Sequence, residues 1–192
     1  GGETMSRDKI IEMIRRNAPS LNISKFHPTE KTVISEARRK EIFKENLLKV
    51  GAEVAEEGEK KRVSAYIKER FPDIIDFEKK EIWAKYQTAD RDELSQIETV
   101  LLKGQFGVAE NGAIWLDESD FPNRLIPFIA QKVVIILDSE QIVENMHQAY
   151  ERIQEVNTGF GVFISGPSKT ADIEQSLVYG AHGPVSFTVV IY

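Results

Sequence analysis

The sequence contains no cysteine among its 192 residues. This absence excludes disulfide bonds, thiol nucleophiles and cysteine-ligated zinc or iron–sulfur sites within the chain. Histidine is scarce, because His27, His147 and His182 lie far apart without the spacing of a metal-binding motif. We therefore predict no metal site. The dinucleotide fingerprint Gly-x-Gly-x-x-Gly is also absent, so we do not expect the chain to carry redox chemistry by itself.

Long hydrophobic runs and an excess of positive charge are missing as well. No apolar segment approaches the length of a membrane span, and no signal-peptide pattern is present, which fits a reducing, cytoplasmic setting. The net charge of −6 argues against a nucleic-acid partner held by phosphate contacts. The basic runs at 15–16, 38–40 and 60–62 each sit among acidic residues, so we interpret them as solvated helix faces.

The length of the chain suits one well-buried domain, which we place at residues 29–192. Residues 1–28 are predicted to form a short helix at 6–17 and an irregular segment. Residues 1–4, ahead of Met5, are expected to be the remnant of an expression tag. Strands are expected at 52–55, 73–77, 97–102, 106–109, 113–116, 133–137, 162–165 and 187–192. Helices are expected at 29–50, 59–70, 138–153 and 170–179. This alternation favours an α/β fold with an open, mostly parallel sheet and helices on both faces.

The string Ser-Gly-Pro-Ser-Lys-Thr-Ala-Asp-Ile-Glu at 165–174 is the most informative motif. It predicts a strand that ends in a Gly-Pro turn and leads into a helix. Ser168, Lys169 and Thr170 would then surround the N-terminus of that helix, where free N–H groups and the macrodipole favour an anion. A second turn at 180–184, Gly-Ala-His-Gly-Pro, is expected to return to the same edge.

Each residue of these turns also has a structural interpretation. Thr170 is a good N-cap, and Asp172 complements the helix dipole without any ligand. Lys169 can pair with Asp172 on the surface. His182 can act as an acid or base near neutral pH, or it can be a structural hydrogen-bonding residue.

The string at 165–174 resembles the C-terminal motif of the LUD domain family, which includes lactate utilization protein C. The resemblance covers about residues 97–192, and the segments 106–116 and 124–127 also carry it. Three positions depart from the family pattern. Asn111 stands where a threonine is usual, Ala113 where a small hydroxyl residue is usual, and Gln131-Lys132 where many members carry a histidine. The resemblance implies the fold of ribose-5-phosphate isomerase, glucosamine-6-phosphate deaminase and the CoA transferases.

The resemblance also implies a function in organic acid metabolism. Such a chain would act with iron–sulfur partner proteins that oxidise L-lactate to pyruvate. The clusters would belong only to those partners, and this chain would be a non-redox subunit without a cofactor of its own. It would bind a small carboxylate or phosphorylated ligand in a crevice at the carboxyl ends of strands, and a homo-oligomer is left open. The implied ligand-binding residues are Asn111, Gly112, Arg124, Gly166, Ser168, Lys169, Thr170, Asp172 and His182.

Glu110 is the candidate catalytic residue, and it defines an alternative function. It precedes Asn111-Gly112 in a tight turn after an apolar strand, where a carboxylate would face a crevice and act as base or nucleophile. Glu-Asn-Gly also resembles the motif of class I CoA transferases, whose glutamate forms an acyl-CoA thioester. The chain would then be a CoA-transferase-like or sugar-phosphate-processing enzyme that uses CoA or a phosphate-containing ligand. A small-ligand sensor is a third interpretation, and a solvated loop residue is the structural alternative for Glu110.

Arg124 has two interpretations as well. It can clamp a carboxylate through two parallel hydrogen bonds. It can instead cover the aromatic rings of Phe121 and Phe128.

Overall fold

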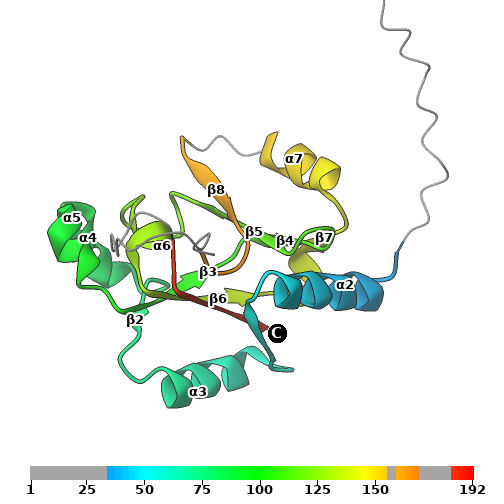
Figure 1. The fold of residues 1–192 in the computed structure, drawn as a ribbon, viewed down its shortest axis with the longest axis horizontal. Helices are drawn as coiled ribbons and strands as arrows, with labels where there is room; N and C mark the ends of the chain where they lie inside the picture. The colour runs from blue at the N-terminus through cyan, green and yellow to red at the C-terminus, as the bar shows by residue number, and fades with distance from the viewer. Residues whose placement is uncertain (1–33, 155–158, 169–182) are drawn as a thin grey trace, which may run out of the picture. The chain divides into compact units, whose positions relative to one another are not determined.

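Two β-sheets packed face to face form the centre of the fold (Figure 1). The structure is a computed structural model that describes residues 34–154, 159–168 and 183–192. The strands of the first sheet, in spatial order, are β1 (Glu53–Glu56), β9 (Ser186–Ile191), β6 (Lys132–Leu137), β3 (Thr99–Lys103) and β2 (Ile75–Asp76). Those of the second are β7 (Ile142–Val143), β4 (Phe106–Val108), β5 (Ala113–Asp117) and β8 (Gly161–Ile164). The predicted segments 1–28 and 170–179 lie outside the described residues.

All neighbours in the five-stranded sheet run parallel, which confirms the predicted α/β class with a mostly parallel sheet. The second sheet was not predicted. Its strands β4 and β7 run parallel, whereas β5 is antiparallel to both β4 and β8. Because β4 and β5 are joined by a tight turn, they form a hairpin that leaves the parallel sheet.

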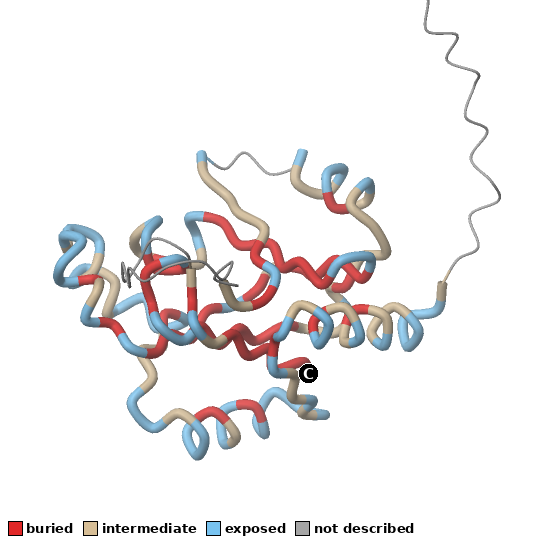
Figure 2. The backbone as a smooth tube through the Cα atoms, viewed as in Figure 1, coloured by how far each residue is buried: buried red, intermediate tan, exposed pale blue. Residues whose placement is uncertain are grey.

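The first sheet is covered on both faces, as its apolar strands predict. Along β6, Val133 and Ile135 face the second sheet, whereas Val134 and Ile136 belong to a cluster with helix α3 (Lys60–Arg70). Each such side chain contributes roughly 1.5–3 kcal/mol when fully buried. Figure 2 shows this burial concentrated on the strands.

The outer face of the second sheet is covered by helix α7 (Met146–Gln154). Ala149 of α7 packs among Phe106, Val108 and Trp115 in a third apolar cluster. The fold therefore consists of α3, the parallel sheet, the second sheet and α7, in that order of layers.

Helix α2 (Glu36–Lys49) buries Phe43 and Leu47 in the core shared by the two sheets. The helix begins at Glu36 because the side chain of Ser35 accepts a hydrogen bond from the Arg38 N–H at 3.3 Å. It ends at Lys49, and Gly51 follows with a φ of +91°. The shorter helices are η1 (Lys80–Ile82), α4 (Trp83–Gln87), α5 (Arg91–Ser95), α6 (Ile126–Ile129) and η2 (Ser139–Gln141).

The predicted helix at 138–153 begins later than expected. Asp138 does accept a hydrogen bond, from Glu140 N–H at 3.0 Å, but it starts only the single turn η2. Ile142 and Val143 then pair with β4 as strand β7, as suits β-branched residues. The helix itself begins at Met146, where the Asn145 side chain accepts a bond from Gln148 N–H at 3.0 Å.

Within the described ranges, no helix combines the length and the apolar character needed to span a bilayer.

Candidate functional site

The predicted turn at Glu110-Asn111-Gly112 joins β4 to β5. Gly112 N–H donates to the Val108 carbonyl at 2.9 Å, and the Asn111 side chain accepts from Ala113 N–H at 2.9 Å. Gly112 has a φ of +70°, a conformation that residues with a Cβ rarely adopt. The local sequence therefore forms the turn that Asn-Gly predicts.

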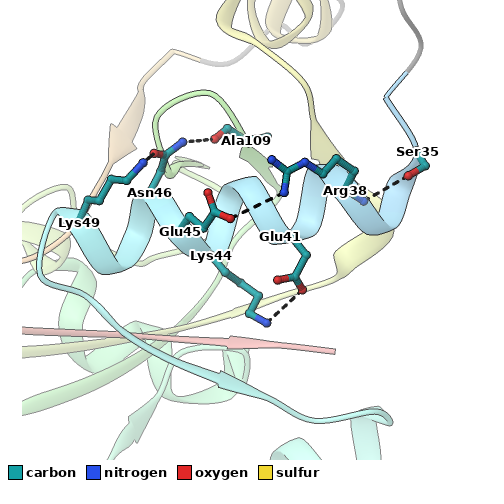
Figure 3. Close-up of polar contacts among 8 residues, drawn as sticks. All are labelled: Ser35, Arg38, Glu41, Lys44, Glu45, Asn46, Lys49 and Ala109. Atoms are coloured by element: carbon teal, nitrogen blue, oxygen red, sulfur yellow. Dashed lines mark hydrogen bonds and ion pairs between the residues drawn. The ribbon is translucent and has the colours of Figure 1, made fainter.

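Helix α2 contacts this turn through the side chain of Asn46. Asn46 Nδ2 donates to the Ala109 carbonyl at 2.8 Å (Figure 3). The same nitrogen donates to the Glu110 carbonyl at 3.0 Å. A Cβ at Gly112 would lie only 3.0 Å from the backbone nitrogen of Leu47. The absence of a side chain at Gly112 thus lets the turn rest on the helix backbone. Sequence analysis missed Asn46, because a polar residue within a helix carries no signal that it reaches a distant loop.

The second predicted motif reaches the same place. Ser165 follows β8, and its Oγ donates to the Asn111 carbonyl at 3.1 Å. Gly166 is buried with a φ of +75°, and a Cβ there would lie 2.7 Å from Val50 Cγ2. The two motifs, 54 residues apart in the chain, therefore meet beside the C-terminal end of α2.

Ser168 and Gly183, which precede and follow residues 169–182 in the chain, also lie close together. Ser168 N–H donates to the Pro184 carbonyl at 2.8 Å, and a Cβ at Gly183 would lie 3.6 Å from Ser168 Cβ. The expected return of the second turn to the first is thus observed for residues 183–184. Lys169, Thr170, Asp172 and His182 lie outside the described residues.

The described candidate residues of the two turns do follow the carboxyl ends of strands, but these strands belong to the second sheet and not to the parallel sheet. Val50 directly precedes the connection to β1, and Pro184 lies two residues before β9, so the site borders the amino ends of these strands. The carboxyl ends that meet here belong to β4, β7 and β8 of the second sheet. The difference arises because β8 pairs with β5 and runs opposite to it, outside the parallel sheet.

Glu110 belongs to the site through its backbone, while its carboxylate points to α7. Glu110 Oε2 accepts a hydrogen bond from the N–H of Met146, the first residue of α7, at 2.8 Å. Glu110 N–H donates to the Glu144 carbonyl at 3.1 Å. A carboxylate at this position satisfies a free N–H and complements the helix dipole. The side chain is exposed, so the structure does not place it in the expected crevice.

Arg124 lies away from the candidates that the structure describes. It pairs with Glu118 Oε2 at 3.2 Å and lies over the ring of Phe160, 5.1 Å from its centroid. Both partners lie where β5 ends and β8 begins, the opposite end of this ladder from Asn111 and Ser165. The alternative expectation was that Arg124 covers the rings of Phe121 and Phe128. The ring that it covers is instead that of Phe160.

A cation that sequence analysis missed lies at the turn. Lys49, the last residue of α2, is exposed and donates from Nζ to Asn46 Oδ1 at 3.1 Å (Figure 3). Its position in the last turn of a helix is ordinary for a lysine, which is why the sequence alone does not single it out. In the part of the chain that the structure describes, no group of three or more histidine or acidic residues is arranged to hold a metal ion.

Comparison with known proteins assigns this fold to a family. Residues 40–192 match the family model of the LUD domain, and the chain belongs to the LUD domain family. The chain is similar to lactate utilization protein C of Anoxybacillus flavithermus, with 38% identity over 85 residues. It is also similar to an uncharacterized protein of Neisseria meningitidis serogroup B, with 36% identity over 89 residues. The first alignment covers 44% of this chain and 39% of the relative, and the second covers 45% and 38%.

A solved structure supports the same fold. The crystal structure of a DUF162 family protein from Deinococcus radiodurans superposes with a TM-score of 0.61. The superposition covers 82% of this chain and 98% of that chain at 19% sequence identity. The likeness confirms the predicted α/β fold.

Proposed function

We propose that this chain is a non-redox component of a lactate utilization system, and that it binds a small carboxylate such as L-lactate or pyruvate. Membership of the LUD domain family and similarity to proteins named lactate utilization protein C support the metabolic assignment. The lack of cysteine supports a non-redox role, with electron transfer left to iron–sulfur partner proteins.

The hydrogen bond from Ser165 Oγ to the Asn111 carbonyl is the observation that carries the binding proposal. It joins the two family motifs of the second sheet at one place. Asn111 is exposed there, and the partly buried Ser168 follows Ser165 by three residues, so the two joined segments carry amide and hydroxyl groups. Such neutral donors orient a small carboxylate once a positive charge offsets the cost of removing it from water.

Calorimetric titration tests this proposal with L-lactate, pyruvate and inorganic phosphate. We expect one equivalent of a carboxylate to bind the wild-type protein, and Ser168→Ala to weaken it about tenfold, which corresponds to about 1.4 kcal/mol. Ser119→Ala is the matched control, because Ser119 lies in the turn that follows β5, at the opposite end of the ladder. Absence of binding to all three anions, or equal losses in both variants, contradicts the proposal.

The partner proposal has its own test. An affinity-tagged chain should retain iron–sulfur partner proteins of the lactate-oxidising system and show no turnover alone. Full lactate oxidation by partners reconstituted without this chain contradicts that role.

We favour ligand binding over acyl transfer because the Glu110 carboxylate accepts the Met146 N–H. Formation of a thioester on Glu110 would first require release of the α7 N-terminus. The enzymatic alternative predicts a CoA adduct, detectable by mass, that disappears in Glu110→Gln. Detection of that adduct would replace the binding proposal with a transferase.

A further inference from the structure

We propose that Lys49 supplies the positive charge that binds the ligand carboxylate, and that the Asn46 side chain holds Lys49 in place for this purpose. The inference rests on the function proposed above. It adds to the site a residue that lies in neither family motif, on a helix that precedes both of them in the sequence.

Asn46 sets the direction of the contact. Its amide nitrogen donates to the carbonyls of Ala109 and Glu110, so the amide oxygen is the atom left to face Lys49. The reverse orientation would place that oxygen against two carbonyl oxygens. Lys49 Nζ donates to Asn46 Oδ1 at 3.1 Å, which links the ammonium group to the turn through one side chain (Figure 3).

The residues that follow Lys49 touch the other motif. Val50 packs against Gly166, where a Cβ would lie 3.1 Å from the Val50 carbonyl oxygen. A Cβ at Gly51 would lie 3.6 Å from Pro167 Cγ. Within six residues, the end of α2 therefore supports the turn after β4, carries a cation and supports the loop after β8.

Among the residues that the structure describes, Lys49 has no carboxylate partner, in contrast to the other lysines of its helix. Lys40 and Lys44 pair with Glu56 at 2.9 and 2.8 Å. Lys49 makes no ion pair with a carboxylate of residues 34–154, 159–168 or 183–192. An ammonium group has three donors, and Asn46 uses one of them.

These observations define the class of ligand. The two donors of the Lys49 ammonium that no described residue uses match an anion with two oxygens on one centre, and the turn held by Asn46 adds the exposed amide of Asn111. A monocarboxylate with a neighbouring hydroxyl or carbonyl group has this chemistry, and so does inorganic phosphate. The titrations below separate the two sources of anionic oxygen.

The test compares Lys49→Met with Lys44→Met, which removes the same charge from the same helix away from the site. L-lactate, pyruvate and inorganic phosphate are titrated into each full-length variant at low and moderate salt. We expect Lys49→Met to raise Kd about tenfold or more and to reduce the dependence of Kd on salt. Lys44→Met should leave Kd within about twofold of wild type, and Lys49→Arg should recover most of the affinity. Both methionine variants should keep a cooperative thermal transition, since Lys49 is exposed and Lys44 is only partly buried.

The outcomes separate this inference from the proposed function. If wild type binds a carboxylate and Lys49→Met binds it equally well with the same salt dependence, the inference is wrong and the proposed function stands. If wild type binds phosphate alone, the ligand is phosphorylated rather than a monocarboxylate, and the proposed substrate class is wrong. If wild type binds none of the three anions, both are wrong.

Discussion

The two ends of the β5–β8 ladder are built from different interactions. At the end that carries the candidate site, main-chain carbonyls accept bonds from Asn46 and Ser165, and two glycines of positive φ rest on α2. At the opposite end, carboxylates accept backbone N–H groups. Asp117 Oδ1 accepts from Ser119 N–H at 2.7 Å, and Glu118 Oε1 accepts from Gly159 N–H at 3.0 Å.

The difference shows which polar groups remain for a ligand. Where carboxylates hold the loops together, their oxygens are already used within the protein, as with the Glu118–Arg124 pair. Where backbone contacts and glycine packing hold the loops, the Asn111 amide nitrogen and the Ser168 hydroxyl form no hydrogen bond with the described residues, and Lys49 donates only to Asn46. The end with Lys49, Asn111 and Ser168 is therefore suited to binding, and the end with Asp117, Glu118 and Asp120 is suited to structure.

Gly166→Ala should produce the largest effect, because it affects the packing that only the site end has. The substitution forces a φ of +75° on alanine and places a Cβ 2.7 Å from Val50 Cγ2. We expect the free energy of unfolding to fall by about 2–4 kcal/mol, measured by denaturant titration. Gly58→Ala is the control, because a Cβ there has no neighbour within 4 Å. Equal stabilities for the two variants would show that the packing against α2 does not hold this loop.

Much of the fold could be predicted because the spacing of apolar residues in the sequence reflects which positions are buried and whether the segment is a helix or a strand. The apolar run of β6 indicates a strand covered on both faces, and its residues do divide between two clusters. The Asn111-Gly112 turn follows from local backbone preference. Ile142 and Val143, by contrast, fit a helical stripe and a strand equally well, so only pairing with β4 decides their state.

The candidate site was less predictable because its support is tertiary. Asn46 lies 63 residues from the carbonyl of Ala109 that it contacts. Nothing in the local sequence of α2 indicates that contact, or the position of Lys49 beside it. The contacts of Arg124 were not predictable for the same reason, since they depend on Glu118 and Phe160, which the fold brings near it.

Glu110→Ala should have a moderate effect, confined to the helix that Glu110 caps. Removing the carboxylate leaves Met146 N–H without its acceptor and removes a negative charge from the α7 N-terminus. We expect a loss of about 1 kcal/mol in the free energy of unfolding, and faster hydrogen exchange of the first α7 amides. Glu110→Gln keeps an acceptor oxygen and should lose less. If Glu110→Ala leaves both stability and exchange unchanged, the carboxylate does not cap α7 in solution.

Arg124→Ala should have a small effect at the opposite end. Its side chain is 62% exposed, and exposed ion pairs contribute about 0.2–1 kcal/mol. We expect a loss of about 0.5 kcal/mol in the free energy of unfolding that shrinks as salt rises, with anion binding unchanged. A tenfold loss of carboxylate affinity in this variant would mean that the two ends are not functionally distinct.

Asp120→Asn should change the free energy of unfolding more at neutral pH than in acid. Burial, the larger cause, and the nearby Asp117 carboxylate raise the pKa of Asp120 above its usual 3.8, while hydrogen bonds from Asp117 N–H and Gln105 lower the pKa. A raised pKa means that the folded protein holds this proton more tightly than the unfolded chain does. The contribution of Asp120 to the free energy of unfolding is therefore complete below about pH 4 and is lost as pH rises through the folded pKa.

In the Asp120→Asn variant, the asparagine oxygen can still accept both hydrogen bonds, and there is no charge to bury. The stability of Asp120→Asn relative to wild type should thus increase from about pH 4 to about pH 7, measured by denaturant titration at each pH. A constant difference across that range would mean that the ionised Asp120 carries no burial cost, and that this end of the ladder is more hydrated than its hydrogen bonds indicate.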